Sequence, residues 1–240
     1  MNKEQIFTDI KKLINIELAK QEIEKIQNFV QLFKFYNAHT NLVSKNDEQY
    51  IYEKHIYDSF ALSLFIQKYK IDNDATVLDI GTGGGFPSIP LSILYPEMKI
   101  TPLDSIAKKI GFIEFVQKEL RLDNLLPVCK RVEEVDDSFR SSFDVVTSRA
   151  VASLNTLLEY TIPFVKVGSY FVAFKSKNID SEIEQAKNAF KILNCKVVDK
   201  ITYVLPTDEA LTRELVIIKK LAETPDCYPR KMGLPRKKPL

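Results

Sequence analysis

A short apolar stretch followed by a cluster of glycines constrains this chain more than any other feature. Thr76–Ile80 is β-branched and apolar, which is typical of a buried strand. Four of the seven glycines of the chain follow at once, at positions 81, 83, 84 and 85. Glycine permits tight turns and a close approach of the backbone to a ligand. Pro87 stands where a helix can begin. The stretch therefore predicts the strand–turn–helix corner at which open α/β sheets bind ligands.

The spacing of these glycines separates two kinds of ligand. Dinucleotide-binding corners have the pattern G-x-G-x-x-G, with a pyrophosphate at the helix N-terminus. Here the pattern is G-x-G-x-G, and Asp79 precedes it at the end of the strand. A carboxylate at this position repels a pyrophosphate and attracts a cation such as the sulfonium of S-adenosylmethionine. Asp104, which ends the next expected strand, can accept hydrogen bonds from ribose hydroxyls. The alternative, in which Asp79 only caps a turn, does not explain why a second acid, Asp104, ends the next strand.

From residue 75 onward, strand patterns alternate with helix patterns. This order predicts an α/β fold of the class I S-adenosylmethionine-dependent methyltransferase (Rossmann-like) type, with about seven mostly parallel strands and helices on both faces. The last two strands have no helix between them, so we expect a hairpin with one antiparallel strand. The expected strands are 76–80, 98–103, 125–130, 143–148, 168–175, 196–204 and 214–219, and the expected helices are 88–95, 105–120 with Ser105 as its N-cap, 153–164 and 179–193.

Two further segments flank this core (residues 71–222). Residues 1–70 form an N-terminal helical extension, because apolar residues recur at helical spacing in 21–36 and 53–67. Residues 223–240 form a basic C-terminal tail, with five Lys or Arg and no acid among the last eleven residues. Such a tail indicates a polyanionic partner or a solvated, disordered end, and composition alone does not decide between them.

Composition excludes several classes of protein. No apolar run approaches the roughly 20 residues that span a bilayer, and the N-terminus lacks the apolar region and cleavage site of a signal peptide. The three cysteines form no C-x-x-C pair, and only two histidines are present. We therefore expect no metal site and a cytoplasmic location.

Several short motifs are spread along the chain. They are Tyr36–Leu42, Lys54–Ser59, Leu78–Leu91, Leu103–Lys109, Arg131–Glu134, Ser148–Ala150 and the C-terminal Tyr228–Lys231 and Lys237–Leu240. Together these motifs resemble one known family, the bacterial guanine-N7 methyltransferases of small-subunit ribosomal RNA, also called the glucose-inhibited division protein B family. The resemblance covers nearly the whole chain, and the proline-rich continuation after the glycines and the Ser-Arg-Ala motif make it specific. Pro102, inside the second strand where the family has an aliphatic residue, is a departure that puts local strand pairing in doubt.

The resemblance implies S-adenosylmethionine as cofactor, 16S ribosomal RNA or the 30S subunit as partner, no membrane association and a monomeric protein. It implies Arg149 and Arg131 as catalytic residues, with Arg149 also at the cofactor. The implied cofactor-binding residues are Gly81, Thr82, Gly83, Gly85 and Phe86 on the methionine side, Asp104 at the ribose, and Val132 and Glu133 at the adenine, and Asp79 and Ser105 are also expected to bind the cofactor. For Arg149 a surface ion pair, and for Glu133 compensation of a helix N-terminus, remain the alternatives.

Methylation at guanine N7 needs no general base, because N7 carries a lone pair and no proton. Proximity and orientation should then supply most of the rate enhancement. Two other functions remain open, namely methylation of another RNA, a protein or a small molecule, and non-catalytic binding to the ribosome. RNA would meet a basic surface, for which the candidates are Lys108, Lys109, Lys175, Arg213, Arg230, Lys231, Arg236, Lys237 and Lys238.

Overall fold

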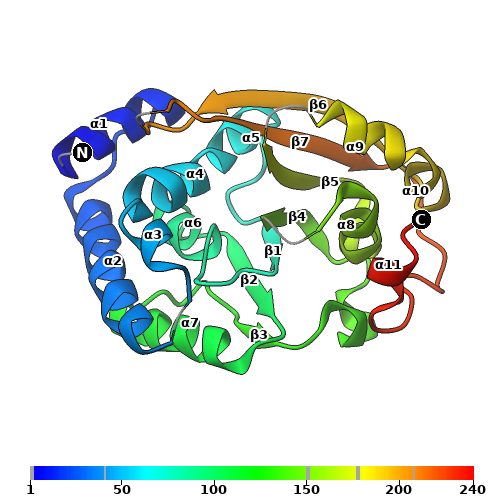
Figure 1. Ribbon diagram of the computed structural model, residues 1–240, viewed down its shortest axis with the longest axis horizontal. Coiled ribbons are helices and arrows are strands. Elements are labelled where there is room, and N and C mark those ends of the chain that lie inside the picture. Colours follow the sequence, from blue (N-terminus) through cyan, green and yellow to red (C-terminus); the bar gives the residue numbers. More distant parts are fainter. Residues whose placement is uncertain (1–2, 41, 150–151, 177–178, 208) are drawn as a thin grey trace.

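The computed structural model describes residues 3–40, 42–149, 152–176, 179–207 and 209–240. Asn41 and Ala150, each part of a motif noted above, lie outside the described residues. Figure 1 shows a central twisted sheet with helices on either side of it. The strands are β1 (Thr76–Ile80), β2 (Lys99–Asp104), β3 (Val128–Cys129), β4 (Phe143–Arg149), β5 (Val165–Ser176), β6 (Cys195–Val204) and β7 (Thr212–Lys220).

The sheet has the order β3-β2-β1-β4-β5-β7-β6. Strands β1 to β5 pair in parallel, whereas β7 runs antiparallel to both β5 and β6. The prediction of a mostly parallel sheet closed by a hairpin is confirmed. The strand order reverses between β1 and β4, so the crevice at their carboxyl ends is the place where such sheets bind ligands.

Alternating side chains of the strands enter two separate cores. Val77, Ile100 and Val145 face a core shared with the N-terminal helices, α6 (Ser88–Leu94) and α7 (Ala107–Leu120). Leu78 and Val146 face the opposite core, which includes α8 (Leu154–Thr161), α9 (Asp180–Gln185) and α10 (Lys187–Ile192). This division agrees with the expected doubly wound sheet.

The N-terminal extension is helical, as predicted, but its segments differ from the expected ones. Helix α2 (Lys20–Thr40) extends beyond the helical pattern that the sequence shows over 21–36. The single helix expected over 53–67 is divided into a π-helical turn, η1 (Ile51–Ile56), and the short helices α4 (Tyr57–Phe60) and α5 (Leu62–Lys68). The remaining N-terminal helices are α1 (Lys3–Ile14) and α3 (Lys45–Glu48).

Two local expectations in the core were wrong. Helix α7 begins after Ile106 and not after Ser105, and its N-cap makes no side-chain hydrogen bond; Asp104 Oδ1 accepts the Ile106 N–H at 3.0 Å and so holds the turn that precedes the helix. The strand expected over 125–130 is reduced to Val128–Cys129 plus one bridge between Ile100 and Leu125.

Proline explains that short third strand. Ile100 exchanges hydrogen bonds with Asn124 and Leu126 on the β3 side. Pro102 faces the same side two residues later and has no N–H to continue the ladder. On the other side of β2, pairing with β1 continues through Asp79 and Pro102 without a break. Pro102 therefore interrupts the pairing of β2 with β3 but not its pairing with β1.

The C-terminal residues are folded onto the protein. They include the short helix α11 (Leu234–Lys237), which contacts α8. Short 3-10 turns complete the chain at η2 (Val132–Glu134), η3 (Asp137–Phe139) and η4 (Ile162–Phe164). No helix in the part of the chain that the structure describes is both long and apolar enough to cross a membrane.

Candidate functional site

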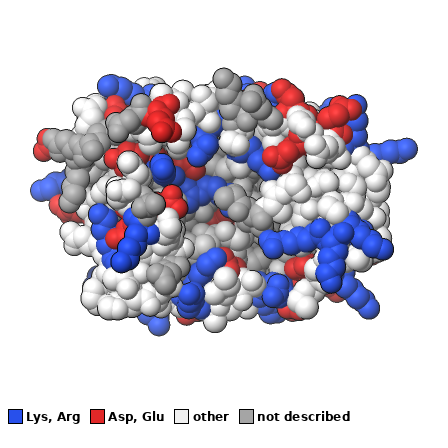
Figure 2. All heavy atoms as spheres, in the orientation of Figure 1, with Lys and Arg blue, Asp and Glu red and all other residues white. Residues whose placement is uncertain are grey.

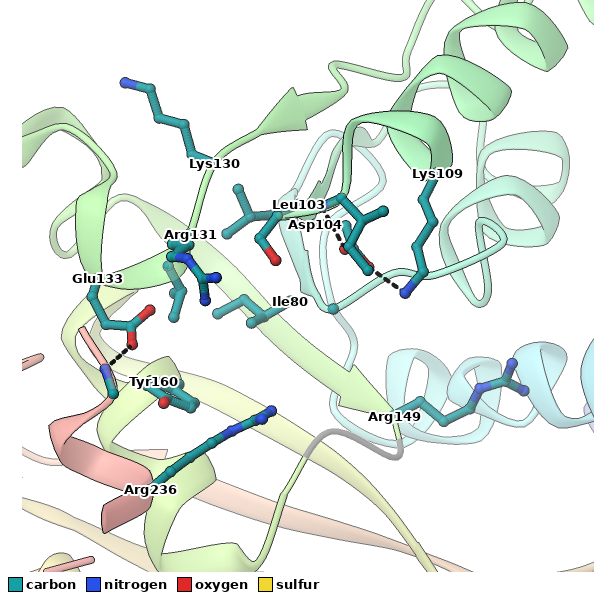
Figure 3. Close-up of a pocket in the computed structure, with 15 residues that line it drawn as sticks. Ile80, Leu103, Asp104, Lys109, Lys130, Arg131, Glu133, Arg149, Tyr160 and Arg236 are labelled. Carbon is teal, nitrogen blue, oxygen red and sulfur yellow. Dashed lines mark hydrogen bonds and ion pairs between the residues drawn. The ribbon is translucent and has the colours of Figure 1, made fainter. Parts of the chain in front are cut away.

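A cavity of about 410 Å³ lies at the carboxyl ends of β1, β2 and β4. Figure 3 shows how side chains from distant parts of the sequence meet around it. Its volume falls in the usual range for small-molecule sites. The lining residues include Gly81, Asp104 and Ser105 after the first two strands, Arg131, Val132 and Glu133 around η2, and Arg149 at the end of β4.

The glycine turn needs glycine for two physical reasons. Gly81, Gly83 and Gly85 have φ values of 75°, 60° and 86°, in the left-handed region that side chains disfavour. At Gly85 a Cβ would also lie 2.4 Å from Ile89 Cδ1, and at Gly84 it would lie 2.5 Å from the Phe33 ring. Larger residues would therefore push α6 or the N-terminal extension away from the turn.

Asp79 lies under this turn and is 1% exposed. Its Oδ2 accepts a hydrogen bond from the Ser88 hydroxyl at 2.7 Å, whereas its buried Oδ1 has no hydrogen-bond partner among the described residues. Burial raises the pKa of Asp79 to about 6, and the Ser88 hydroxyl opposes this only in part. A buried carboxylate oxygen without a donor fits a site for a cationic group.

Asp104 borders the cavity at the end of β2. Its Oδ2 accepts the Gly83 N–H at 3.1 Å and faces Lys109 Nζ at 3.3 Å, so it also holds the glycine turn in place. With the Ile106 N–H, which donates to Oδ1, the Asp104 carboxylate has three donors and about four acceptor sites. One further donor, such as a ribose hydroxyl, can therefore be accommodated.

The other predicted cofactor residues divide into two groups. Gly81, Asp104, Ser105, Val132, Glu133 and Arg149 line the cavity, whereas Asp79, Thr82, Gly83, Gly85 and Phe86 do not. Phe86 packs against Phe29 and Phe33, with ring centroids 5.3 and 5.4 Å away. For Phe86 this position differs from the expected lining role, because helix α2 covers its ring.

Arg149 joins the core to the N-terminal extension. Its guanidinium donates to Asp58 Oδ2 at 3.0 Å and to the Lys54 carbonyl at 3.3 Å, and lies 2.9 Å from His55 Nδ1. Tyr203 donates to the other oxygen of Asp58 at 2.6 Å. The surface ion pair considered as an alternative is thus a half-buried network, and burial together with the Arg149 charge lowers the pKa of His55 to about 3.

Arg149 also separates two cavities. In Figure 3 its side chain points away from the first cavity, toward the N-terminal helices. A second cavity of about 430 Å³ lies on that side, between η1 and the ends of β4, β5 and β7, and Lys54, His55, Arg149 and Arg213 are among its lining residues. The end of β4 therefore contacts both spaces.

Several lysines and arginines expected to meet RNA make contacts inside the protein instead. Lys175 is 10% exposed and pairs with Glu182 at 2.6 Å, and Lys109 pairs with Asp104. Lys108 donates to the Thr40 carbonyl at 2.8 Å, and Arg230 pairs with the fully buried Glu159 at 2.6 Å. Lys175 is therefore held by the partly exposed Glu182, and Arg230 by the buried Glu159, and neither the ammonium nor the guanidinium group faces solvent without a partner. The side chains of Lys231, Arg236, Lys237 and Lys238 are exposed.

Tyr160 and Gly233 belong to the cavity wall but were not predicted from the sequence. Tyr160 comes from the C-terminal end of α8 and Gly233 from the turn before α11. Neither belongs to a motif with a chemical signature. They line the cavity only because the C-terminal segment folds back beside the sheet, and no local sequence pattern indicates that path.

Comparison with solved structures defines the class of protein. The crystal structure of M. jannaschii TYW2 in complex with AdoMet aligns with a TM-score of 0.51 at 19% identity, over 65% of this chain and 76% of that one. A putative RNA methyltransferase from Pyrococcus horikoshii aligns with a TM-score of 0.53 at 13% identity, over 69% and 84%. These likenesses concern the fold, which is that of the class I S-adenosylmethionine-dependent methyltransferases.

Sequence comparison then identifies the family. The family model described as rRNA small subunit methyltransferase G matches residues 22–211. Proteins named ribosomal RNA small subunit methyltransferase G are 41% identical in Brevibacillus brevis, over 100% of both chains, and 42% identical in Staphylococcus saprophyticus, over 94% of this chain and 93% of the relative. The chain belongs to the rRNA small subunit methyltransferase G family, which confirms the resemblance drawn from its motifs.

Proposed function

We propose that this protein transfers a methyl group from S-adenosylmethionine to N7 of a guanine in 16S ribosomal RNA, acting as a monomer in the cytoplasm. The observation that carries the proposal is the pair of carboxylates, Asp79 and Asp104, at the ends of adjacent strands around one glycine turn. The family to which the chain belongs supports RNA of the small subunit as the substrate.

The residues present fit the cofactor. Asp79 offers a buried oxygen without a hydrogen-bond donor beneath the turn, and Asp104 has room for one more donor at the cavity. Val132 and Glu133 border the end of the cavity farther along the sheet edge, where the adenine would bind. When bound, S-adenosylmethionine supplies a methyl group activated by a sulfonium.

The chain's own residues then have to position the acceptor. Guanine N7 needs no proton removed, so Arg149 and Arg131 are proposed to hold and orient the base and its phosphates. Arg149 suits this role because its residue borders both cavities while three acceptors of the N-terminal extension fix its guanidinium. Arg131 is exposed at the rim of the first cavity.

Transfer of labelled methyl groups tests the proposal. Purified protein is incubated with S-adenosylmethionine and, in separate reactions, with 30S subunits, free 16S ribosomal RNA and 23S ribosomal RNA, and the modified base is mapped. We expect label on N7 of one guanine of 16S ribosomal RNA and none on 23S. Label on a protein or small molecule, or binding to 30S subunits with no transfer, would support one of the other functions instead.

A further inference from the structure

The C-terminal segment, Arg230–Leu240, is attached to α8 by one buried ion pair. The backbone N–H and Nε of Arg230 both donate to Glu159 Oε1 at 2.8 Å, and an Nη atom donates to Oε2 at 2.6 Å. Glu159 is fully buried, so its charge depends on this partner. Arg230 also donates to the Lys238 carbonyl at 2.7 Å, which closes the segment into a loop.

The inner side of this loop forms part of the wall of the first cavity. The Gly233 N–H donates to Glu133 Oε1 at 3.2 Å, and the backbone turns there with φ at 77°. Gly233 and Arg236 both line the cavity, together with Tyr160 from α8. Figure 3 shows the Arg236 side chain extending from α11 toward the cavity, opposite Arg131 and Asp104.

The outer side of the same loop is basic. Lys231, Lys237 and Lys238 are exposed and form no ion pair within the residues that the structure describes. The segment contains no acidic residue. Figure 2 shows a dense group of Lys and Arg side chains on the part of the surface where α11 lies in Figure 1. Such a surface suits a phosphate backbone, which binds clustered cations without base specificity.

We propose that the C-terminal segment is a shared wall, which completes the S-adenosylmethionine cavity with its inner side and binds RNA phosphates with its outer side, so that each ligand strengthens the binding of the other. The inference rests on the proposed function, because it takes cofactor and RNA from it. Its physical basis is that the segment is held by few polar contacts, from Arg230 to Glu159, from Gly233 to Glu133 and from Thr156 to the Pro235 carbonyl, so either ligand can add contacts that order it further. The second ligand then meets a wall already in place. Linkage makes the effect reciprocal.

The cofactor side is tested by calorimetric titration of the full chain with S-adenosylhomocysteine in the absence of RNA. Arg236→Ala should weaken binding by about 3–10-fold, as expected for the loss of one polar contact. The matched control is Lys196→Ala, which removes an exposed charge at the start of β6, far from the carboxyl ends of the parallel strands. Amide hydrogen exchange in 231–238 should also slow when S-adenosylhomocysteine binds. If both the affinity and the exchange rate are unchanged, the C-terminal segment does not form part of the cofactor cavity and the inference is wrong.

The coupling is tested by measuring the same dissociation constant with and without a saturating 16S ribosomal RNA transcript. For the unaltered chain, RNA should tighten cofactor binding by about 5-fold or more. The triple variant Lys231→Ala/Lys237→Ala/Lys238→Ala should lose most of this factor. The triple variant Lys99→Ala/Lys191→Ala/Lys196→Ala, with equal charge loss elsewhere, should keep it.

The outcomes separate this inference from the proposed function. If both ligands bind and the coupling factor of the first triple variant equals that of the unaltered chain, the shared wall is wrong and the proposed function stands. If the unaltered chain binds no S-adenosylhomocysteine, or binds neither 16S ribosomal RNA nor 30S subunits, the proposed function fails and the coupling fails with it.

Discussion

The two ends of the chain are attached to the sheet by different forces. In Figure 1 the N-terminal helices lie on one side of the sheet and the C-terminal segment lies beside α8 on the other. The N-terminal extension is joined through a cluster of buried aromatic rings, in which Phe29 and Phe33 contact Phe86 and Phe112. The C-terminal segment is joined through polar contacts, the ion pair of Arg230 with Glu159 and the hydrogen bond of Gly233 to Glu133, in addition to the contact of α11 with α8.

This difference has a physical consequence. Apolar burial does not depend on one geometry, and its contribution is spread over many contacts. A buried ion pair, in contrast, stabilises the structure only while its two partners keep their hydrogen-bonding geometry. The N-terminal extension is therefore a fixed part of the methyltransferase, whereas the C-terminal segment can respond to ligands. Four predictions test this contrast.

The largest effect is expected at the aromatic junction. Phe33→Ala should lower the free energy of unfolding by about 3–5 kcal/mol, because the fully buried ring leaves a cavity against Phe86 and Gly84. Phe35→Ala on the same helix, where the ring is 68% exposed, should change it by less than about 0.5 kcal/mol. Denaturant unfolding measures both variants. Similar losses in the two would mean that this junction does not hold the extension.

The C-terminal anchor should give the next largest effect. Arg230→Met leaves the charge of Glu159 buried without its side-chain partner and should cost about 3 kcal/mol of unfolding free energy. The double variant Arg230→Met/Glu159→Leu should recover much of this loss, because no buried charge remains. If the double variant is as unstable as Arg230→Met, packing and not charge attaches the segment.

The raised pKa of Asp79 predicts that the free energy of unfolding depends on pH. Its pKa is raised to about 6 in the folded chain, so the protonated form stabilises the fold. That contribution is complete below about pH 4 and is lost as the pH rises through about 6, by an amount on the order of 2 to 3 kcal/mol.

Comparison of unfolding free energies for the unaltered chain and Asp79→Asn between pH 4 and 8 isolates this contribution. The difference in unfolding free energy between the unaltered chain and the variant should change across that pH window and stay constant above it. In the same window S-adenosylhomocysteine, whose ammonium is a cation, should bind the unaltered chain more tightly as the pH rises. A constant difference from pH 4 to 8 would mean that Asp79 is ionised throughout.

The smallest effects distinguish lysines that face solvent from lysines that are paired. Lys237→Ala should reduce the slope of log affinity for RNA against log salt by about 1, as for one lost phosphate contact. Lys175→Ala should leave the slope unchanged, because Glu182 and the Ala152 carbonyl hold that ammonium. Filter binding over a salt series measures both slopes. An equal decrease in the two variants would show that RNA displaces the Lys175 pair.

Much of the site could be predicted because its features are local. The strand, the glycine turn and Asp79 occupy ten consecutive residues, and Asp104 ends the neighbouring strand, so a parallel sheet brings them together. Ser105 was expected to cap helix α7, but the helix begins one residue later, because Asp104 accepts the Ile106 N–H and keeps Ser105 and Ile106 in the preceding turn. The π-helical turn before Asp58 has no sequence signal of its own, and it leaves the Lys54 carbonyl in reach of Arg149.

By itself, the amino-acid sequence determined the class of fold, the ligand-binding corner and the family, because strand alternation and glycine spacing act over short distances along the chain. Only the tertiary structure decided which basic residues face solvent, what Arg149 contacts and where the C-terminus lies. Arg149 meets Asp58 and Arg230 meets Glu159 across long separations in sequence. Pairing of buried charges depends on the path of the whole chain, which no local pattern encodes.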